Sequence, residues 1–349
     1  MSTWPVYTGT EEPHDGVSRL PDPPPWRAFD GGPALPAPAQ EDHSVSLDRK
    51  HRAGTYQATQ ESIDLVNAAL VLRRPLLITG PPGSGKSSLP YAVARELRLG
   101  PVLRWNITSR STLQDGLYQY DPMARLYAAS TGAGRKQPGE AGDRDTVGDG
   151  VPAGDAIEDH LRLGPLGTAL LPYEQPRVLL IDEIDKSDLD LPNDLLNVLE
   201  EGQYEIPELV RAAEDAPTAR LMAAGGEARV TVERGLVRCR AFPFIVLTSN
   251  GEREFPPAFL RRCVPLHLRR PEPHHLEAIV RAHLGELDGE TKHMIETFLH
   301  RSSTGELATD QLLNAIYLSR VPGLTAESRE ALAASLMTHL GPVAEFHDF

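Results

Sequence analysis

The sequence lacks the features of a disulfide-rich, a zinc-binding or a membrane-spanning protein. It has only two cysteines, Cys239 and Cys263, and neither belongs to a C-x-x-C pair, so no disulfide framework or zinc site is indicated. No stretch approaches the roughly 18 apolar residues that a membrane-spanning helix needs, and the first ten residues do not resemble a signal peptide. We therefore expect a cytoplasmic protein without a membrane span.

The chain also lacks an excess of basic residues. It carries 35 Lys and Arg against 49 Asp and Glu, which gives a net charge of −14. A chain with this balance has no overall positive field for holding a phosphodiester backbone, so nucleic acid is disfavoured as the main partner. What it does have is 349 residues with 40% hydrophobic content, enough for two domains and a large core.

Three segments stand out by composition. Residues 1–48 are rich in proline, glycine and acidic side chains, which predicts a disordered Pro-rich tail. A low-complexity Gly/Asp stretch at about 133–155 predicts a mobile insertion. Residues at about 226–243 alternate around Arg234 and Gly235, which predicts an inserted β-hairpin behind a polar stretch. The arginines of this hairpin are the one local place where acidic segments or nucleic acid would be held.

The rest of the chain predicts an α/β domain followed by helices. Five apolar segments have the composition of β-strands: 75–79, 102–107, 177–181, 244–248 and 264–268. Helical stretches separate them, which favours a parallel sheet with helices on both faces and a ligand site at the strand carboxyl ends. After residue 271 the apolar residues follow helical spacing. We expect an α/β core over 49–270 and a helical region over 271–349.

A phosphate-binding loop follows the first predicted strand. The residues GPPGSGKSS match the P-loop pattern G-x-x-x-x-G-K-[ST], in which glycines let successive N–H groups face one anionic ligand. We expect Lys86 to reach the β- and γ-phosphates and Ser87 to ligate the Mg²⁺ that bridges them. The predicted nucleotide-binding residues are Gly80, Pro81, Pro82, Gly83, Ser84, Gly85, Lys86, Ser87 and Ser88. Pro90 removes one helical N–H, so the next helix should begin tightened or bent.

Two later strands end in polar residues that suit hydrolysis. VLLIDEID ends in Asp182, the expected magnesium partner, and Glu183, the expected base that orients the attacking water. FIVLTSNG ends in Asn250, which is placed to hold that water or to sense the γ-phosphate. An ordinary Asn-Gly turn is the alternative interpretation of Asn250.

These motifs together carry a family resemblance. GPPGSGKSS, VLLIDEIDK, FIVLTSNG and PPAFLRRC occur in the order and rough spacing of the AAA+ ATPases, and the chain is most similar to the MoxR-like branch. The segment 191–209 resembles the helix and hairpin that follow the acidic strand in that branch. The resemblance implies a P-loop NTPase core with a five-stranded parallel sheet, a C-terminal helical lid, ATP and Mg²⁺ as cofactors, and a hexameric ring. It also implies that ATP hydrolysis remodels a partner protein, often one with a von Willebrand factor A domain.

The resemblance assigns further roles. Arg262 in PPAFLRRC matches the arginine finger, which reaches the γ-phosphate held by the next subunit, and this implies an oligomer. Where MoxR-like proteins carry a lid arginine, this chain has Gln311, which puts lid closure or the hydrolysis rate in doubt; Arg301 and Arg320 are the alternative sources of that charge. Tyr56 and Gln57 are our candidates for the base pocket.

Two other function classes remain open from the sequence. One is a nucleotide-dependent switch or scaffold that binds ATP and hydrolyses it little, which Gln311 and Pro90 would favour. The other is a P-loop kinase for a small molecule, which Glu183 disfavours because a base of this kind prepares water and not an acceptor hydroxyl.

Overall fold

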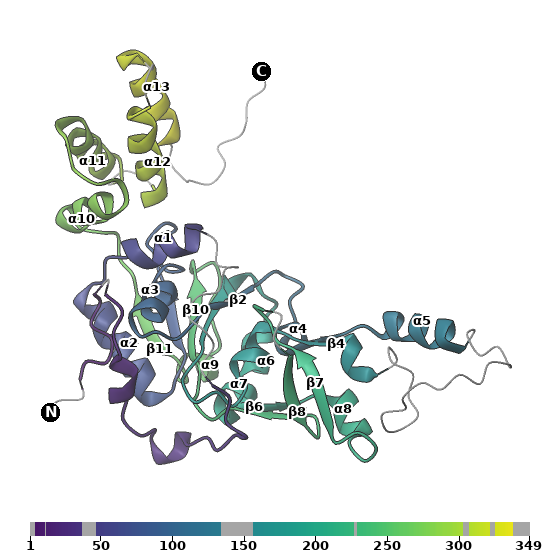
Figure 1. Cartoon of the computed structure of the whole chain (residues 1–349). Helices are drawn as coiled ribbons and strands as arrows, with labels where there is room; N and C mark the ends of the chain where they lie inside the picture. The colour runs from purple at the N-terminus through teal and green to yellow at the C-terminus, as the bar shows by residue number, and fades with distance from the viewer. Residues whose placement is uncertain are drawn as a thin grey trace.

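A computed structural model describes most of the chain. The described residues are 4–10, 12–36, 47–133, 156–226, 229–302, 307–321 and 325–337. In Figure 1 they form an α/β body, a second sheet beside it and a group of helices at the C-terminal end.

The centre of the body is a parallel sheet of five strands. They are β1 (Leu76–Thr79), β2 (Leu103–Asn106), β5 (Val178–Asp182), β10 (Phe244–Ser249) and β11 (Val264–His267). Their spatial order is β11-β1-β10-β5-β2, and every neighbouring pair is parallel. Strands β5 and β10 are buried along their whole length, as expected for a sheet covered on both faces. The predicted five-stranded sheet is confirmed.

Two apolar layers cover the central sheet. One contains α2 (Gln60–Leu72) and α3 (Leu89–Glu96), and the other contains α6 (Pro165–Ala169), α7 (Leu191–Glu201) and α9 (Pro257–Leu260). Because side chains alternate along a strand, Leu76 and Ile78 of β1 join the first layer and Leu77 joins the second. This packing holds the carboxyl ends of β1, β5 and β10 at one edge of the sheet.

The N-terminal segment is not a disordered tail, so that prediction is wrong for residues 4–10 and 12–36. Val6 and Tyr7 are fully buried against α2 and α3. Their backbone N–H groups donate to Asn67 Oδ1 at 2.7 and 2.9 Å. Further along, the Glu96 carboxylate accepts hydrogen bonds from the backbone of Thr8 and Thr10. Polar side chains of the folded body thus accept hydrogen bonds from the backbone N–H groups of a segment that has few apolar residues of its own.

A second anchor fixes the end of this segment. Arg27 lies buried over the rings of Phe29 and Phe242. Its guanidinium donates to the carbonyl of Arg73 at the end of α2 and to those of Leu199 and Glu200 at the end of α7. Carbonyls at helix ends lack partners within their own helix, and a cation there is favourable.

The second sheet has six strands and is larger than the predicted hairpin. Its strands are β3 (Tyr118–Tyr120), β4 (Leu161–Leu163), β6 (Gln203–Glu205), β7 (Thr218–Met222), β8 (Arg229–Glu233) and β9 (Leu236–Arg238). The turn at Arg234 and Gly235 is present between β8 and β9. However, β8 pairs along its length with β7, and β9 pairs with β6. The stretch before the hairpin, residues 211–228, was predicted as polar, yet it contains the end of α8 (Pro207–Ala212) and the whole of β7.

Between β3 and β4 the chain forms α5 (Pro122–Ala133), which projects outward near the second sheet in Figure 1. The predicted mobile insertion at 133–155 lies outside the described residues, except for Ala133 at the end of α5.

The C-terminal region is helical, as predicted. It consists of α10 (Pro273–Leu284), α11 (Gly289–Ser302), α12 (Thr309–Ser319) and α13 (Ala326–Leu336). These helices share a small core of their own, built around Leu276, Ile295, Leu312 and Ile316. The region follows β11 and stands beside the carboxyl edge of the central sheet (Figure 1).

Candidate functional site

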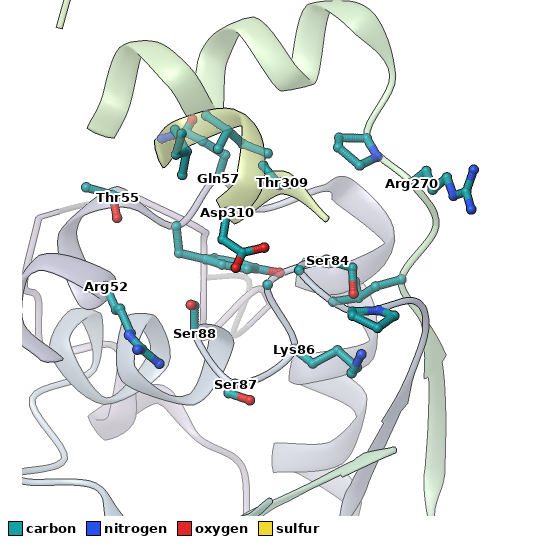
Figure 2. Close-up of a pocket in the computed structure, with 18 of the residues that line it drawn as sticks. Arg52, Thr55, Gln57, Ser84, Lys86, Ser87, Ser88, Arg270, Thr309 and Asp310 are labelled. Atoms are coloured by element: carbon teal, nitrogen blue, oxygen red, sulfur yellow. The ribbon is translucent and has the colours of Figure 1, made fainter. Parts of the chain in front are cut away.

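A cavity of about 1100 Å³ lies where the carboxyl edge of the sheet meets the helical region. Its walls come from the P-loop, α1 (Leu47–Thr55), the connection from β11 to α10, and α12. In Figure 2, Lys86, Ser87 and Ser88 lie on the P-loop side, and Thr309 and Asp310 of α12 lie across from them. Of the predicted nucleotide-binding residues, 82–88 line the cavity, while Gly80 and Pro81 do not.

The three P-loop glycines occupy backbone positions that other residues rarely adopt. Gly80, Gly83 and Gly85 have φ values of 148°, 73° and 87°. A Cβ on Gly80 would lie 2.3 Å from the Leu268 carbonyl oxygen, and one on Gly83 would lie 2.8 Å from the Thr309 nitrogen. The loop therefore needs glycine both for its turns and for its contact with the start of α12.

The P-loop lysine is held by its own loop. Lys86 Nζ donates to the carbonyls of Gly80 and Pro81 at 2.7 and 2.8 Å. Burial lowers the pKa of Lys86, although the nearby carboxylates of Asp185, Asp182 and Glu183 oppose this shift.

Two further features of the loop bear on its function. Ser84 Oγ is buried and, among the described residues, has no hydrogen-bond partner. A loop with an unsatisfied buried hydroxyl and a lysine bonded to carbonyls fits an anionic ligand. The helix after the loop begins only at Leu89, with Pro90 in its first turn, which is the tightened start that the proline predicts.

Asp182 is the centre of a hydrogen-bond network. Its Oδ1 accepts from Ser87 Oγ at 2.8 Å and from Thr248 Oγ1 at 2.7 Å, and its Oδ2 accepts from Arg104 Nη2 at 2.7 Å. Burial alone would raise the pKa of Asp182, but the bonds from Thr248, Ser87 and Arg104 outweigh it and hold the pKa below its ordinary value. The predicted metal ligands, Ser87 and Asp182, are therefore in direct contact, and the lowered pKa of Asp182 favours the carboxylate form that Mg²⁺ binds.

The donor set fits Mg²⁺ in the presence of a nucleotide. A hydroxyl and a carboxylate are oxygen ligands of the kind that Mg²⁺ prefers, and the ion takes its other ligands from phosphates and water. Within the described ranges, no group of three or more His, Cys, Asp or Glu side chains is arranged to hold a metal ion. The hydroxyl of Ser87 and the carboxylate of Asp182 are thus suited to a metal ion that arrives with phosphate.

Glu183 follows Asp182 in a strained conformation. Its φ of 62° is in the left-handed region, which a non-glycine residue adopts only where its surroundings enforce it. The Glu183 N–H donates to Thr248 Oγ1 at 2.9 Å, and its carboxylate accepts from Lys186 Nζ at 2.8 Å. Asn250 is fixed through its backbone, whose N–H donates to Asp185 Oδ2 at 2.8 Å. Both Glu183 and Asn250 line the cavity beside the P-loop.

Arg262, the predicted arginine finger, does not line the large cavity. Its Nε donates to Glu200 Oε2 at 2.7 Å and its Nη1 to the Ala258 carbonyl at 3.0 Å, beside a small cavity of about 10 Å³ that Arg27 and Arg74 also line. The structure therefore does not bring Arg262 together with Lys86, Asp182 and Glu183 of the same chain.

The start of α12 carries no arginine into the cavity. Gln311 Oε1 accepts from the Ala308 N–H at 2.9 Å, which caps the helix, and it is Asp310 and Asn314 that line the cavity. Neither Arg301 nor Arg320 lines it, and Arg320 donates to carbonyls within the helical region. The two candidates for replacing a lid arginine thus do not line the cavity.

The two candidates for the base pocket also belong to the large cavity. Tyr56 and Gln57, the candidates for the base pocket, both line it. The Tyr56 ring packs over the P-loop, 3.3 Å from where a Cβ on Gly85 would lie, and burial raises its pKa to about 12. His51 of α1 and His283 of α10 are in contact at 3.0 Å and connect the body to the helical region.

Arg104 and Thr248 are site residues that the sequence motifs did not reveal. Thr248 lies in FIVLTSNG, a segment in which the sequence predicted a role for Asn250 alone. Arg104 is the one charged residue of the predicted strand 102–107, and this charge within a strand was the available signal.

A comparison with protein families identifies the class of domain. The AAA domain family, dynein-related subfamily, matches residues 75–263, which is more than half of the chain. No curated protein sequence matches significantly. A crystal structure of NtrX from Brucella abortus in complex with ADP is similar at 16% sequence identity and a TM-score of 0.39, over 80% of this chain and 57% of that one. The chain thus spans little more than half the length of that protein. No helix within the described residues is long and apolar enough to cross a bilayer.

Proposed function

Since the chain belongs to the AAA domain family, dynein-related subfamily, we propose that it is a Mg²⁺-dependent ATPase whose active site is the cavity beside the P-loop. One observation carries the proposal: Ser87 and Asp182 are hydrogen-bonded at 2.8 Å on the wall that Lys86 and Glu183 share. These are the four side chains that phosphate binding, metal binding and water activation require.

The residues of the chain divide the work. Lys86 would exchange the carbonyls of Gly80 and Pro81 for phosphate oxygens, which are better partners for an ammonium group. Ser87 and Asp182 would hold Mg²⁺, which supplies positive charge to the phosphate oxygens when bound. Glu183 would leave Lys186 and accept the proton of the attacking water, and Asn250 would orient that water.

We further propose that hydrolysis requires an oligomer, with the hexamer of the MoxR-like branch as the expected form. Arg262 is part-exposed and does not line its own chain's large cavity, which supports a role at the cavity of a neighbour. A guanidinium supplied in this way stabilises charge on the transferring phosphoryl group. Turnover per chain should therefore rise with protein concentration, and Arg262→Ala should remove that rise.

The partner in this proposal is a protein that the ATPase remodels, with von Willebrand factor A domain proteins as the first class to test. The segment 191–209 supports the MoxR-like assignment, since it forms helix α7 followed by strand β6, which pairs with β9. A Glu183→Gln variant should hold such a protein in the presence of ATP, and Lys86→Ala should not.

The test of the central proposal is phosphate release from ATP with Mg²⁺ across a range of protein concentrations. Glu183→Gln should reduce turnover by about 100-fold or more, as expected for loss of a base. Glu254→Gln removes the same charge at an exposed residue that does not line the cavity, and it should leave turnover unchanged. Equal turnover in the wild type and Glu183→Gln would refute the proposed role of Glu183.

Two observations favour a second function, a switch that binds ATP and hydrolyses it little. Glu183 is paired with Lys186, and α12 offers Asp310 to the cavity in place of an arginine. Tight ATP binding that promotes assembly, without phosphate release at any protein concentration, would decide for the switch.

A further inference from the structure

Arg104 is a charged residue on the wall of the phosphate site. It lies in β2 between the buried Leu103 and Trp105, and the register places it opposite Leu180, two residues before Asp182. Its side chain is 35% exposed and lines the same cavity as Lys86 and Ser87. The central sheet therefore holds a guanidinium at the phosphate side of the cavity.

The only partner of this guanidinium within the described part of the chain is Asp182. The contact is a single bond, from Nη2 to Oδ2, at 2.7 Å. A guanidinium has five N–H donors in a planar fork, so most of them remain unused. The side chain is partly exposed and the residue lines the cavity, so a ligand in the cavity can reach it.

The Asp182 bond is also the one that a metal would weaken. A divalent cation beside Asp182 draws on the same negative charge as Arg104 and repels the guanidinium. Ser87 and Thr248 share the other oxygen, Oδ1, so the carboxylate stays fixed without Arg104. Metal binding would therefore free Arg104 without releasing Asp182.

Other positive charges on the cavity wall come from Arg52 of α1 and from Arg269 and Arg270 in the connection between β11 and α10, but none comes from α12. Helix α12 contains no arginine, and it presents Asp310 and Asn314 to the cavity. A triphosphate has a γ-phosphate that a diphosphate lacks, and with it more negative charge, and a guanidinium binds a phosphate with good geometry.

We propose that Arg104 is a terminal-phosphate contact supplied by the same chain: the guanidinium that bonds Asp182 in this structure passes to the γ-phosphate when Mg²⁺ and a triphosphate bind. The inference rests on the proposed function, because it requires the cavity to hold the nucleotide with its phosphates at the P-loop. It makes Arg104 a residue that distinguishes triphosphate from diphosphate and links that distinction to the metal.

The test compares the affinity of two nucleotides for the full chain, by calorimetric titration with Mg²⁺. The probes are ADP and the non-hydrolysable triphosphate AMP-PNP. Arg104→Gln should weaken AMP-PNP binding by about 10-fold or more, the value of a lost charge-assisted hydrogen bond, and change ADP binding by less than about 2-fold. Arg104→Lys keeps the charge but not the fork, so it should give an intermediate loss for AMP-PNP.

Arg110→Gln is the matched control. Arg110 is exposed in the connection that follows β2, does not line the cavity, and carries the same charge. Its replacement should leave both affinities as in the wild type. Thermal unfolding checks that each variant folds. If Arg104→Gln does not fold, the affinities of Arg104→Lys are compared with those of the wild type instead.

Two results would overturn the inference. Equal losses for ADP and AMP-PNP would show that Arg104 only sets the charge of the site, and unchanged affinities would show that it serves Asp182 alone. Either result leaves the proposed function intact, since the wild type would still bind both nucleotides. A wild type that binds neither nucleotide would refute the proposed function as well.

Discussion

Two buried carboxylates of this molecule, Asp182 and Glu96, both accept hydrogen bonds and have different uses. Asp182 is 7% exposed and Glu96 is 1% exposed, and each accepts several hydrogen bonds. The donors to Glu96 all come from the N-terminal segment, and Glu96 lines none of the cavities described above. The donors to Asp182 all line the large cavity together with Lys86. A buried carboxylate that accepts hydrogen bonds thus anchors a segment when it is enclosed by that segment. It belongs to a binding site when the residues that donate to it line a cavity.

The largest effect that we expect at the cavity is a loss of nucleotide affinity in Lys86→Ala. Lys86→Ala removes an ammonium group that would make more than one charge-assisted bond to phosphate, so affinity for ADP should fall by about 100-fold or more. The free energy of unfolding should change by less than about 1 kcal/mol, because the buried charge costs about as much as its two bonds to carbonyls return. Calorimetric titration and urea unfolding measure the two quantities.

Lys292→Ala is the control, since Lys292 is exposed on α11 and does not line the cavity. A large loss of stability in Lys86→Ala without a loss of affinity would make Lys86 an anchor like Glu96 and break the contrast.

The second prediction concerns Glu96, the carboxylate that anchors the N-terminal segment. Glu96→Ala leaves the N–H groups of Thr8 and Thr10 without their acceptor, and the free energy of unfolding should fall by about 2 kcal/mol. Affinity for ADP should stay as in the wild type, because Glu96 does not line the cavity. Urea unfolding measures the loss, and limited proteolysis should cleave the N-terminal segment earlier.

Glu96→Gln serves as the matched variant, because its amide oxygen still accepts one hydrogen bond and the loss should be smaller. A fall in ADP affinity in either variant would mean that the N-terminal segment belongs to the site.

A third prediction concerns the contact between the P-loop and α12. Gly83→Ala combines a strained φ of 73° with a Cβ only 2.8 Å from Ala308 Cβ, so α12 would have to move away from the cavity. We expect ADP affinity to fall by about 10-fold, of which strain in the loop supplies a part. Gly285→Ala has a φ of 82° but meets nothing within 4 Å, so it should cost stability and leave affinity unchanged. Equal affinities in the two variants would show that the α12 contact has no effect on binding.

The sequence predicted those parts of the molecule whose causes are local. The strand segments and the P-loop are each contiguous, so their pattern is visible within a few residues. Asp182, Lys86 and Ser87 were identified for the same reason, and the parallel sheet then brings them together. The helical C-terminal region followed from the spacing of its apolar residues.

The parts that the sequence did not predict depend on distant partners. The composition of the N-terminal segment predicted disorder, because composition does not show contacts with distant residues. One such contact is the hydrogen bond from the Val6 N–H to Asn67, 61 residues away. Arg104 finds Asp182 78 residues later, and β9 pairs with β6 more than thirty residues before it. Such pairs are decided by tertiary packing, which a single sequence does not display.

The smallest expected effect tests the charge of Asp182 itself. Hydrogen bonds from Thr248, Ser87 and Arg104 outweigh burial and lower the folded pKa, so the ionised carboxylate stabilises the folded chain. A lowered folded pKa gives stability that is fully present above the unfolded value of about 3.9 and is lost as the pH falls through the folded pKa. Asp182→Asn should therefore be less stable than the wild type by about 1 kcal/mol at pH 7, and the difference should shrink below about pH 4. Urea unfolding at several pH values measures it, and a difference that stays constant from pH 7 to about pH 3 would mean that the carboxylate acts through its shape and not its charge.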